Sequence, residues 1–271
     1  MTMMIEEKSG GSTATMLTCI GLRESLEGCS WDRAGAVAPR LVVVGELAAV
    51  ALDVPLAEFV GEEAESKLKD LSWLGPRVTR HDALTRGAFA AGPVVPCRFG
   101  TLFADDAALG EMLRERSDRL RAFLLANRDG AEWLVKIAGD AELVRNQAVQ
   151  ERLRGAGMSI ESTKSGAGYL MLQRAKREAA GVANERLRTG AAAVLEAIAS
   201  LGGERIVAGR NESERADGCV PLAKVSCLVR SGVGAGFAGA MGMLSEVIRG
   251  DGLVVECEGP LPLYSFCADA F

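Results

Sequence analysis

The stretch from Asp70 to Thr101 reads DLSWLGPRVTRHDALTRGAFAAGPVVPCRFGT, and it holds the only histidine of the chain. Gly75-Pro76 interrupts the first helical pattern, which therefore ends at Trp73–Leu74. Proline is tolerated in the first turn of a helix, where an N–H group has no partner to lose. The sequence therefore predicts a new helix that begins at Pro76.

This second helix has one apolar face with the histidine in it. The face is formed at three- and four-residue spacing by Val78, His81, Leu84 and Ala88. Such a pattern is typical of an amphipathic helix on a core, so His81 is expected to point inward. Gly92-Pro93 ends the helix, and Val94–Cys97 continues as an extended segment into Arg98–Thr101.

Several motifs in this stretch and beyond it form an ordered series. They are Asp70–Leu74 (DLSWL), Arg80-His81, Val95–Phe103 (VPCRFGTLF), Glu132–Lys136 (EWLVK) and Gly259–Phe266 (GPLPLYSF). In this order they resemble the gas vesicle protein F/L family (GvpF/GvpL), over most of the chain from about residue 15 onward. The family's closing motif is GPWPPYSF, so Leu261 and Leu263 replace a tryptophan and a proline.

The resemblance implies an accessory or minor structural protein of gas vesicle formation, located in the cytoplasm and at the gas vesicle. It implies binding of the small hydrophobic shell protein GvpA, to chaperone it or to nucleate assembly, and contact with other gas vesicle accessory proteins. It implies no enzyme activity and no cofactor. The candidate positions for partner binding or for structural locks are Trp73, His81, Arg98, Phe99, Trp133, Pro260, Tyr264 and Phe266.

The overall composition is that of a soluble globular protein. Hydrophobic residues make up 48% and charged residues 25% of 271 residues, and the formal net charge is −5. A negative chain gives no reason to expect nucleic acid as a partner. We found no apolar run near the roughly 18 residues that span a bilayer. The polar, acidic residues 1–14 are expected to be a disordered tail rather than a signal peptide.

The seven cysteines do not form a metal-binding pattern. Their number is odd, no CxxC occurs, and only one histidine is available. The usual cysteine and histidine zinc spacings are therefore absent, and a reduced compartment is the simplest interpretation. We expect no metal and no cofactor, and most of these thiols should be small core side chains.

Two α+β domains are predicted, at residues 15–129 and 130–258. In the first we expect a strand at Thr15–Ile20 and a hairpin of Leu41–Val44 with Leu47–Leu52. We also expect a helix opening at Pro55, and another capped by Asp105 that reaches about Asn127.

The second domain is expected to be a modified ferredoxin-like βαββαβ fold with a long helix in its first crossover. Its predicted elements are a strand at Glu132–Ala138, a helix capped by Asp140, a helix at about Gly168–Leu201, strands at Arg205–Ala208 and Val220–Arg230, a helix at Gly234–Arg249 and a strand at Leu253–Glu258. The long helix carries a packing seam of Ala183, Leu187, Ala191, Val194, Ile198 and Leu201. Gly202-Gly203 is expected to end it, and Ser159–Gly168 is expected to be a loop.

Residues 259–271 are expected to form an extended tail that packs back on the domains. Pro260 and Pro262 donate no backbone hydrogen bond, so we expect that this tail does not continue a sheet. Arg98–Thr101 is interpreted chiefly as a structural lock, with Arg98 tied to Asp70 or to helix ends, and otherwise as a partner-binding loop.

The sequence also offers two enzymatic alternatives. Gly234–Gly239 (GAGFAG) matches GxGxxG, but only one strand follows it, so a complete dinucleotide-binding fold cannot be built. Cys97 beside Arg98, with His81 on the preceding helix, would form a thiol–imidazole pair if the two side chains met. A third possibility is a regulatory module that binds a small metabolite between the domains.

Overall fold

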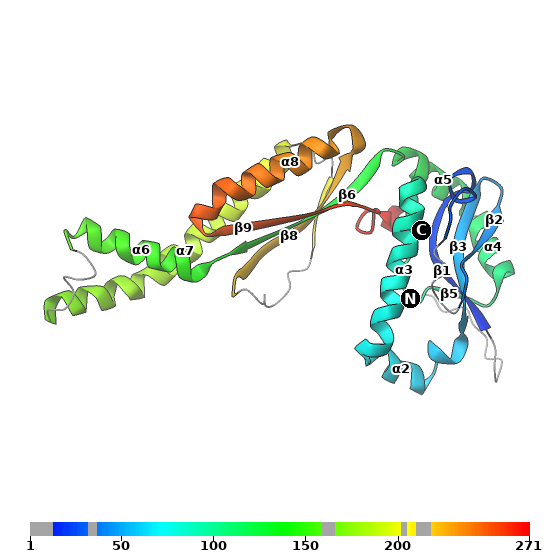
Figure 1. Ribbon diagram of the computed structural model, residues 1–271, viewed down its shortest axis with the longest axis horizontal. Helices are drawn as coiled ribbons and strands as arrows, with labels where there is room; N and C mark the ends of the chain where they lie inside the picture. The colour runs from blue at the N-terminus through cyan, green and yellow to red at the C-terminus, as the bar shows by residue number, and fades with distance from the viewer. Residues whose placement is uncertain (1–12, 32–36, 159–165, 202–204, 210–217) are drawn as a thin grey trace. The chain divides into compact units, whose positions relative to one another are not determined.

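The structure is a computed structural model, and it describes residues 13–31, 37–158, 166–201, 205–209 and 218–271 (Figure 1). The fold mixes helices and sheets, and the chain divides into two compact units. Unit 1 is Met1–Glu132 with Leu261–Phe271, and unit 2 is Trp133–Pro260. The last residues of the chain therefore belong to the same unit as the first.

Unit 1 is built on an antiparallel sheet. Its strands are β1 (Thr13–Leu22), β2 (Arg40–Val44), β3 (Leu47–Pro55), β4 (Val94–Pro96) and β5 (Leu102–Phe103). The strand order is β2-β3-β1-β4, and β5 also pairs with β1. The predicted hairpin is confirmed, because Val44 pairs with Leu47 across a turn in which Gly45 has a φ of 58°. That positive φ favours glycine.

Helices pack on both faces of this sheet (Figure 1). They are α1 (Arg23–Leu26), α2 (Glu62–Lys69), α3 (Leu71–Ala91), α4 (Asp106–Glu115) and α5 (Ser117–Ala126), with a 3-10 turn at Leu56–Glu58. The α3 side chains Leu84 and Ala88 pack on one face of the sheet. The opposite face is covered by the leucines of α4 and α5, namely Leu109, Leu113, Leu120 and Leu124.

The predicted helix break at Gly75-Pro76 is wrong. The helix α3 runs without interruption from Leu71 to Ala91 and contains Pro76. Asp70 caps it, since its carboxylate accepts a hydrogen bond of 2.8 Å from the N–H of Ser72. Pro76 costs only the backbone bond to the Ser72 carbonyl near the helix start, and packing of the rest of the helix outweighs that loss. The predicted end at Gly92 is confirmed.

Two other helix predictions in unit 1 need correction. No single helix opens at Pro55: a 3-10 turn comes first, and α2 begins after Gly61, whose φ is 98°. The helix predicted from Asp105 to Asn127 is two helices separated at Arg116. The Asp105 cap itself is confirmed, because its carboxylate accepts a hydrogen bond of 2.9 Å from the N–H of Ala108.

In the part of unit 2 that the structure describes, a four-stranded sheet is accompanied by three α-helices and a 3-10 turn at Arg249–Asp251. The strands are β6 (Gly130–Gly139), which begins at the end of unit 1, β7 (Arg205–Ala208), β8 (Val220–Arg230) and β9 (Leu253–Leu261), in the order β7-β8-β6-β9. The helices are α6 (Ala141–Gly155), α7 (Gly166–Ser200) and α8 (Ser231–Ile248). Helices α6 and α7 lie side by side (Figure 1).

The long helix matches its sequence pattern closely. Of the predicted seam, Ala183, Leu187, Ala191, Val194 and Ile198 are all buried, while Leu201 is half-buried just beyond the helix end. With 35 residues, α7 is roughly 50 Å long. The helix stop predicted at Gly202-Gly203 lies outside the described residues, as do residues 159–165 of the predicted loop and residues 1–12 of the predicted tail. The loop predicted at Ser159–Gly168 is wrong at its end, because α7 already begins at Gly166. The tail predicted at residues 1–14 is likewise too long, because β1 begins at Thr13.

The sequence underestimated the length of the last strand. We expected that Pro260 would not extend the sheet, yet β9 continues through Gly259 and Pro260 to Leu261. A proline is compatible with an edge position, and β9 is the outer strand of the order β7-β8-β6-β9. Beyond it, the chain ends in a 3-10 turn at Cys267–Ala270 within unit 1.

Candidate functional site

An aromatic cluster in unit 1 brings together three of the nominated residues, and we define it as Phe59, Trp73, His81 and Phe99. The rings of His81 and Phe99 are 5.6 Å apart, and the ring of Phe59 lies 5.8 Å from Phe99 and 5.6 Å from Trp73. Arg77 lies 4.2 Å above the centre of the Trp73 ring. These edge-on and tilted contacts are favourable aromatic geometries, so the cluster fastens α3 to neighbouring loops.

His81 is a core residue of this cluster. Its side chain is 5% exposed, and burial lowers its pKa, while a hydrogen bond to the backbone of Leu17 partly opposes that shift. Its Nε2 atom is buried and has no hydrogen-bond partner among the described residues. A neutral, enclosed imidazole of this kind is a structural element rather than an accessible base.

Cys97 does not share an environment with His81. Its side chain packs into the cluster under α4 and α5, with the thiol directed at the carbonyl oxygen of Val95, 3.8 Å away. His81 lies on α3, which packs on the opposite face of the sheet (Figure 1). Burial raises the pKa of Cys97 well above its ordinary value, which disfavours the reactive thiolate. The geometry therefore argues against the thiol–imidazole pair.

Arg98 does not tie its turn to Asp70. The side chain of Arg98 is exposed, and the Asp70 carboxylate is used by Ser72 at the start of α3. The turn is held instead by its own backbone and by Thr101, whose hydroxyl donates to the Arg98 carbonyl at 2.7 Å. Gly100 has the positive φ expected there, 81°.

The C-terminal segment, Leu261–Phe271, is part of the core of unit 1. Leu263 and Phe266 are buried, and the Tyr264 hydroxyl donates to the Asp82 carboxylate on α3. Burial, with that hydrogen bond, raises the pKa of Tyr264. Of the nominated tail residues, Tyr264 and Phe266 thus hold the segment in place, whereas Pro260 is an exposed residue of β9.

Sequence reasoning missed Glu132, which anchors this segment. Its side chain is 3% exposed, and its carboxylate accepts hydrogen bonds from the backbone N–H and the hydroxyl of Ser265, both at 2.8 Å. A charged group this deeply buried requires such partners. The only signal was its place at the head of EWLVK, a charged residue near the start of the buried strand β6.

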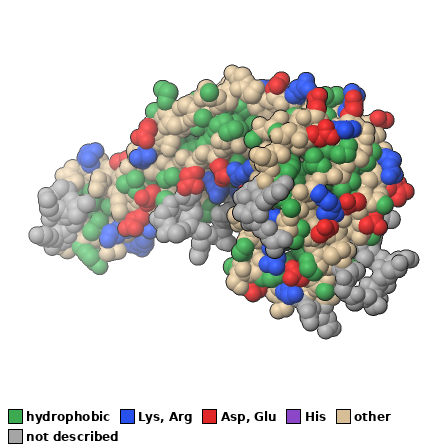
Figure 2. All heavy atoms as spheres, turned by 45° about the vertical axis from the view of Figure 1, so that its right-hand side comes forward, with side chains coloured by type: hydrophobic (Ala, Val, Ile, Leu, Met, Phe, Trp, Pro, Cys, Tyr) green, Lys and Arg blue, Asp and Glu red, His purple; other side chains and the backbone are tan. Residues whose placement is uncertain are grey.

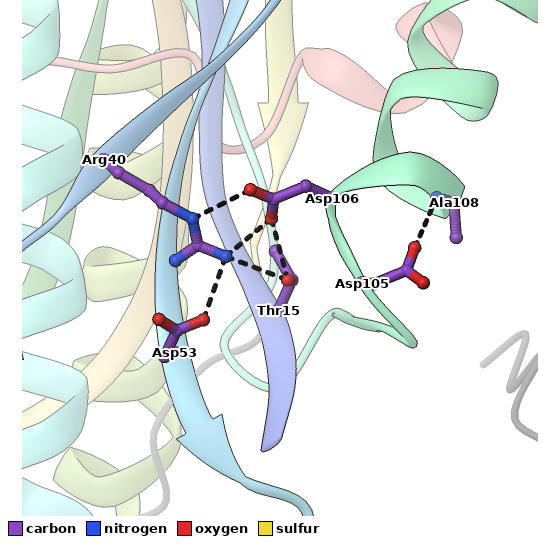
Figure 3. A network of polar contacts seen from close by, with 6 residues as sticks. All are labelled: Thr15, Arg40, Asp53, Asp105, Asp106 and Ala108. Carbon is purple, nitrogen blue, oxygen red and sulfur yellow. Dashed lines mark hydrogen bonds and ion pairs between the residues drawn. The ribbon is translucent and has the colours of Figure 1, made fainter. Parts of the chain in front are cut away.

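A second network that the sequence did not reveal surrounds Arg40 (Figure 3). Its guanidinium donates to both carboxylate oxygens of Asp106, at 3.0 and 2.6 Å, and to the Thr15 hydroxyl at 3.0 Å. Asp53 lies 2.9 Å from the same nitrogen, Nη2. The hydrogen bond from Arg40 lowers the pKa of Asp106. The network joins three strands to the start of α4, so its role is structural.

The GxGxxG motif has a structural explanation in unit 2. Gly234 lies against the ring of Trp133, and Phe237 packs on that ring with 5.6 Å between ring centres. Gly259 is still closer, because a Cβ atom there would lie 2.5 Å from the indole. Trp133 is therefore a core anchor between α8 and β9, and the glycines make room for it. The motif begins inside α8 and not at a phosphate-binding turn.

A groove of about 780 Å³ runs between α6, α7 and α8. Its apolar lining includes Val144, Gly190, Ala193, Val194, Leu244, Ile248 and Leu253. Charged side chains stand along it, among them Arg186, which forms an ion pair with Glu151 across α6 and α7. An apolar concave surface with polar edges can accept an amphipathic segment of a partner.

Helix α8 exposes an apolar outer face, which we define as Gly232, Gly236, Gly239, Met243 and Val247. Met243 is 74% and Val247 76% exposed. The stretch Ser231–Asp251 is long and apolar enough to cross a membrane by length and composition, and only 17% of its most apolar 18 residues are buried. The prediction that no apolar run approaches the length of a bilayer span is therefore wrong for this helix. Each helical glycine costs about 0.5–1 kcal/mol relative to alanine, so this face weakens its own helix.

Elsewhere the surface is mixed. Figure 2 shows basic and acidic side chains interspersed on the face in view, with no field of one sign. Within the described residues, no group of three or more histidine, cysteine, aspartate or glutamate side chains is arranged to hold a metal ion.

The sequence is similar to known proteins of one family. The family model described as "Gas vesicle synthesis protein GvpL/GvpF" matches residues 27–268. The chain is 28% identical over 227 residues to gas vesicle protein F of Streptomyces sp. (strain CB03234), covering 84% of this chain and 87% of that protein. It is 32% identical over 115 residues to gas vesicle protein L of the same strain, covering 42% of each.

Solved structures show the same fold. The crystal structure of GvpF from Anabaena sp. PCC7120 superposes with a TM-score of 0.62 at 11% identity, covering 94% of this chain and 96% of that one. GvpF from Microcystis aeruginosa gives 0.57 at 12% identity, covering 94% and 98%. The fold is thus the one seen in these two GvpF structures. The chain belongs to the GvpL/GvpF family of gas vesicle synthesis proteins.

Proposed function

We propose that this chain is an accessory protein of gas vesicle formation that binds the hydrophobic shell protein GvpA, and so chaperones it or nucleates wall assembly. The family match ties the chain to gas vesicle formation. The observation that carries the binding step is the groove between α6, α7 and α8. A hydrophobic client must be covered in transit, and an amphipathic helix laid in an apolar groove is a common way to do so.

The groove suits such a client in three respects. Its lining combines the small, exposed Ala193 with the aliphatic Val194 and Leu244, which permits close approach of a helix. The Arg186–Glu151 pair at its edge offers both charges to the polar side of the client. The strand order β7-β8-β6-β9 supports a ferredoxin-like arrangement for unit 2, and such a sheet would give the groove a rigid base.

The experiment is co-expression with GvpA and affinity capture of the tagged chain. Ala193 is exposed in the groove, so Ala193→Trp fills the groove without entering the core. Ala180→Trp is the matched control, since Ala180 is also exposed on α7 but does not line the groove. The wild type and Ala180→Trp should retain GvpA, and Ala193→Trp should lose most of it.

Equal retention by both variants would exclude the groove as the contact, and no retention by the wild type would exclude stable GvpA binding. A thermal melt of each variant verifies that folding is unchanged. Deletion of the C-terminal segment is not a suitable test, because Leu263 and Phe266 are core residues and their loss would unfold unit 1.

A further inference from the structure

The helical hairpin of α6 and α7 ends in exposed apolar side chains. The end of α6 and the start of α7 project beyond the sheet of unit 2 (Figure 1). In the first turns of α7, Tyr169 is 56%, Leu170 is 69% and Met171 is 45% exposed. Single exposed apolar side chains are ordinary, whereas neighbouring ones mark a contact surface. We define these three residues as the hairpin tip.

The hairpin tip points in several directions at once. Successive side chains of a helix are turned by about 100° from one another, so the three spread around the exposed side of α7. The remaining direction holds the seam with α6, to which Leu172 and Ala175 belong. A flat or grooved protein surface would cover only part of such a tip. The boundary between the headgroups and the acyl chains of a bilayer would enclose it on every exposed side.

Positive charge gathers beside the hairpin tip, although the chain as a whole has a net charge of −5. Residues 152–158 and 166–178 contain one acidic side chain, Glu178, and five basic ones, namely Arg152, Arg154, Arg174, Lys176 and Arg177. Glu178 accepts a hydrogen bond of 2.8 Å from Arg174 and lies 3.4 Å from Arg152. Glu151, the preceding carboxylate on α6, is paired with Arg186. The single charge of Glu178 cannot also balance Lys176 and Arg177, so this end of the hairpin is positive and suits an anionic partner.

The basic side chains follow the hairpin tip at a spacing that fits a membrane surface. Lys176 and Arg177 come roughly 10 Å after Leu170 along the axis of α7. An interfacial segment buries its apolar side chains by about 5–10 Å, while lysine and arginine stay at the level of the anionic headgroups. Tyrosine is favoured at the same boundary. We propose that the end of the α6–α7 hairpin binds the surface of an anionic phospholipid bilayer and inserts the hairpin tip into it.

This contact leaves the proposed GvpA groove free. Leu170 is roughly 35 Å along α7 from Ala193, which lines the groove. The hairpin tip, Lys176 and Arg177 do not line the groove. Bilayer binding therefore stands or falls separately from GvpA binding.

The test is flotation of the full chain with vesicles of phosphatidylcholine, either alone or mixed equally with phosphatidylglycerol. The wild type should bind the mixed vesicles at about 50 mM salt. Its affinity should fall about tenfold or more at about 300 mM salt, or on phosphatidylcholine alone, because the attraction is then screened or absent. Tyr169→Gln, Leu170→Gln and Met171→Gln combined should weaken binding about tenfold or more. Lys176→Gln with Arg177→Gln should weaken it about tenfold on the mixed vesicles.

Two matched controls should bind like the wild type. Met243→Gln with Val247→Gln removes two exposed apolar side chains from α8, and Lys67→Gln with Lys69→Gln removes two charges from α2. Equal melting temperatures show that each variant is folded.

Three outcomes overturn the proposal. A wild type that does not float with the mixed vesicles at low salt removes bilayer binding. Unchanged flotation of the tip variant, or an equal loss in the α8 control, places the contact elsewhere. Retention of the wild type on polyglutamate beads without flotation assigns the positive end of the hairpin to an acidic protein instead.

Discussion

The Glu132 carboxylate and Ser265 are joined by two hydrogen bonds of 2.8 Å, although 133 residues separate them in the sequence. Glu132 is the last residue of the first part of unit 1, and Ser265 lies in the segment that returns to it after unit 2. The pair therefore fastens the end of the chain to the unit in which the chain begins. Tyr264 adds a third hydrogen bond, to Asp82.

Removing the charge of Glu132 should loosen this segment. Glu132→Gln retains one acceptor but weakens both bonds, and we expect a loss of about 1–3 kcal/mol in the free energy of unfolding. Ser265→Ala should lose less, and the double variant should lose less than the sum of the single changes. Urea titration gives the energies, and protease cleavage within 261–271 reports the loosening. Glu111→Gln, on an exposed position of α4, is the control.

Stability should depend on pH through His81. Burial lowers the folded pKa of His81, so the unfolded chain binds a proton more readily. Its contribution is therefore complete above about pH 6.5, the ordinary value, and is lost as the pH falls below it. His81→Gln should lower stability at pH 7.5 yet flatten the decline from pH 7 toward pH 5. An unchanged decline in the variant would assign the dependence to other groups.

The Arg40 network should influence the pH dependence of stability at a more acidic pH than His81 does. The hydrogen bond from Arg40 lowers the pKa of Asp106, so the pair stabilises the fold above the ordinary aspartate value and loses this effect as the pH falls through the folded value. The pair is partly exposed, so we expect Asp106→Asn to cost only about 0.5–1.5 kcal/mol at neutral pH. Urea titrations at pH 7 and pH 3 should show the variant's deficit shrinking in acid.

Substitution of glycine by alanine should change the free energy of unfolding in opposite directions at two positions. Gly259→Ala places a Cβ atom 2.5 Å from the Trp133 ring, and we expect a loss of about 1–3 kcal/mol or more. Gly181→Ala meets nothing within 4 Å and should gain about 0.5–1 kcal/mol, because alanine favours the helix. Urea titration followed by circular dichroism gives the free energy of unfolding of both variants. If Gly259→Ala leaves the free energy of unfolding unchanged, the indole of Trp133 moves aside without cost, and the prediction is wrong.

Local periodicity predicted those parts of the fold in which buried residues recur at regular spacing. The seam of α7 was recognisable because one apolar stripe continues over many turns, and the hairpin because two apolar runs flank Gly45-Glu46. Helix interruptions were predicted poorly. Pro76 was tolerated inside α3, while the separation at Arg116 has no glycine or proline to mark it.

Contacts distant in sequence could not be read from local patterns. Nothing in EWLVK indicates that Glu132 meets Ser265, and nothing near Arg40 indicates Asp106. His81 was expected to face inward and does, but the sheet separates it from Cys97. The glycines of α8 suggested a phosphate loop because the motif alone does not tell which of them are open to solvent.

The most direct test of the proposed function is site-specific photo-crosslinking in cells that make GvpA. A benzophenone amino acid at position 193 lies in the groove, and one at position 180 lies on α7 outside it. The proposal predicts a GvpA adduct from position 193 and none from position 180. Equal adducts from both positions, or an adduct only from position 180, would contradict binding of GvpA in the groove.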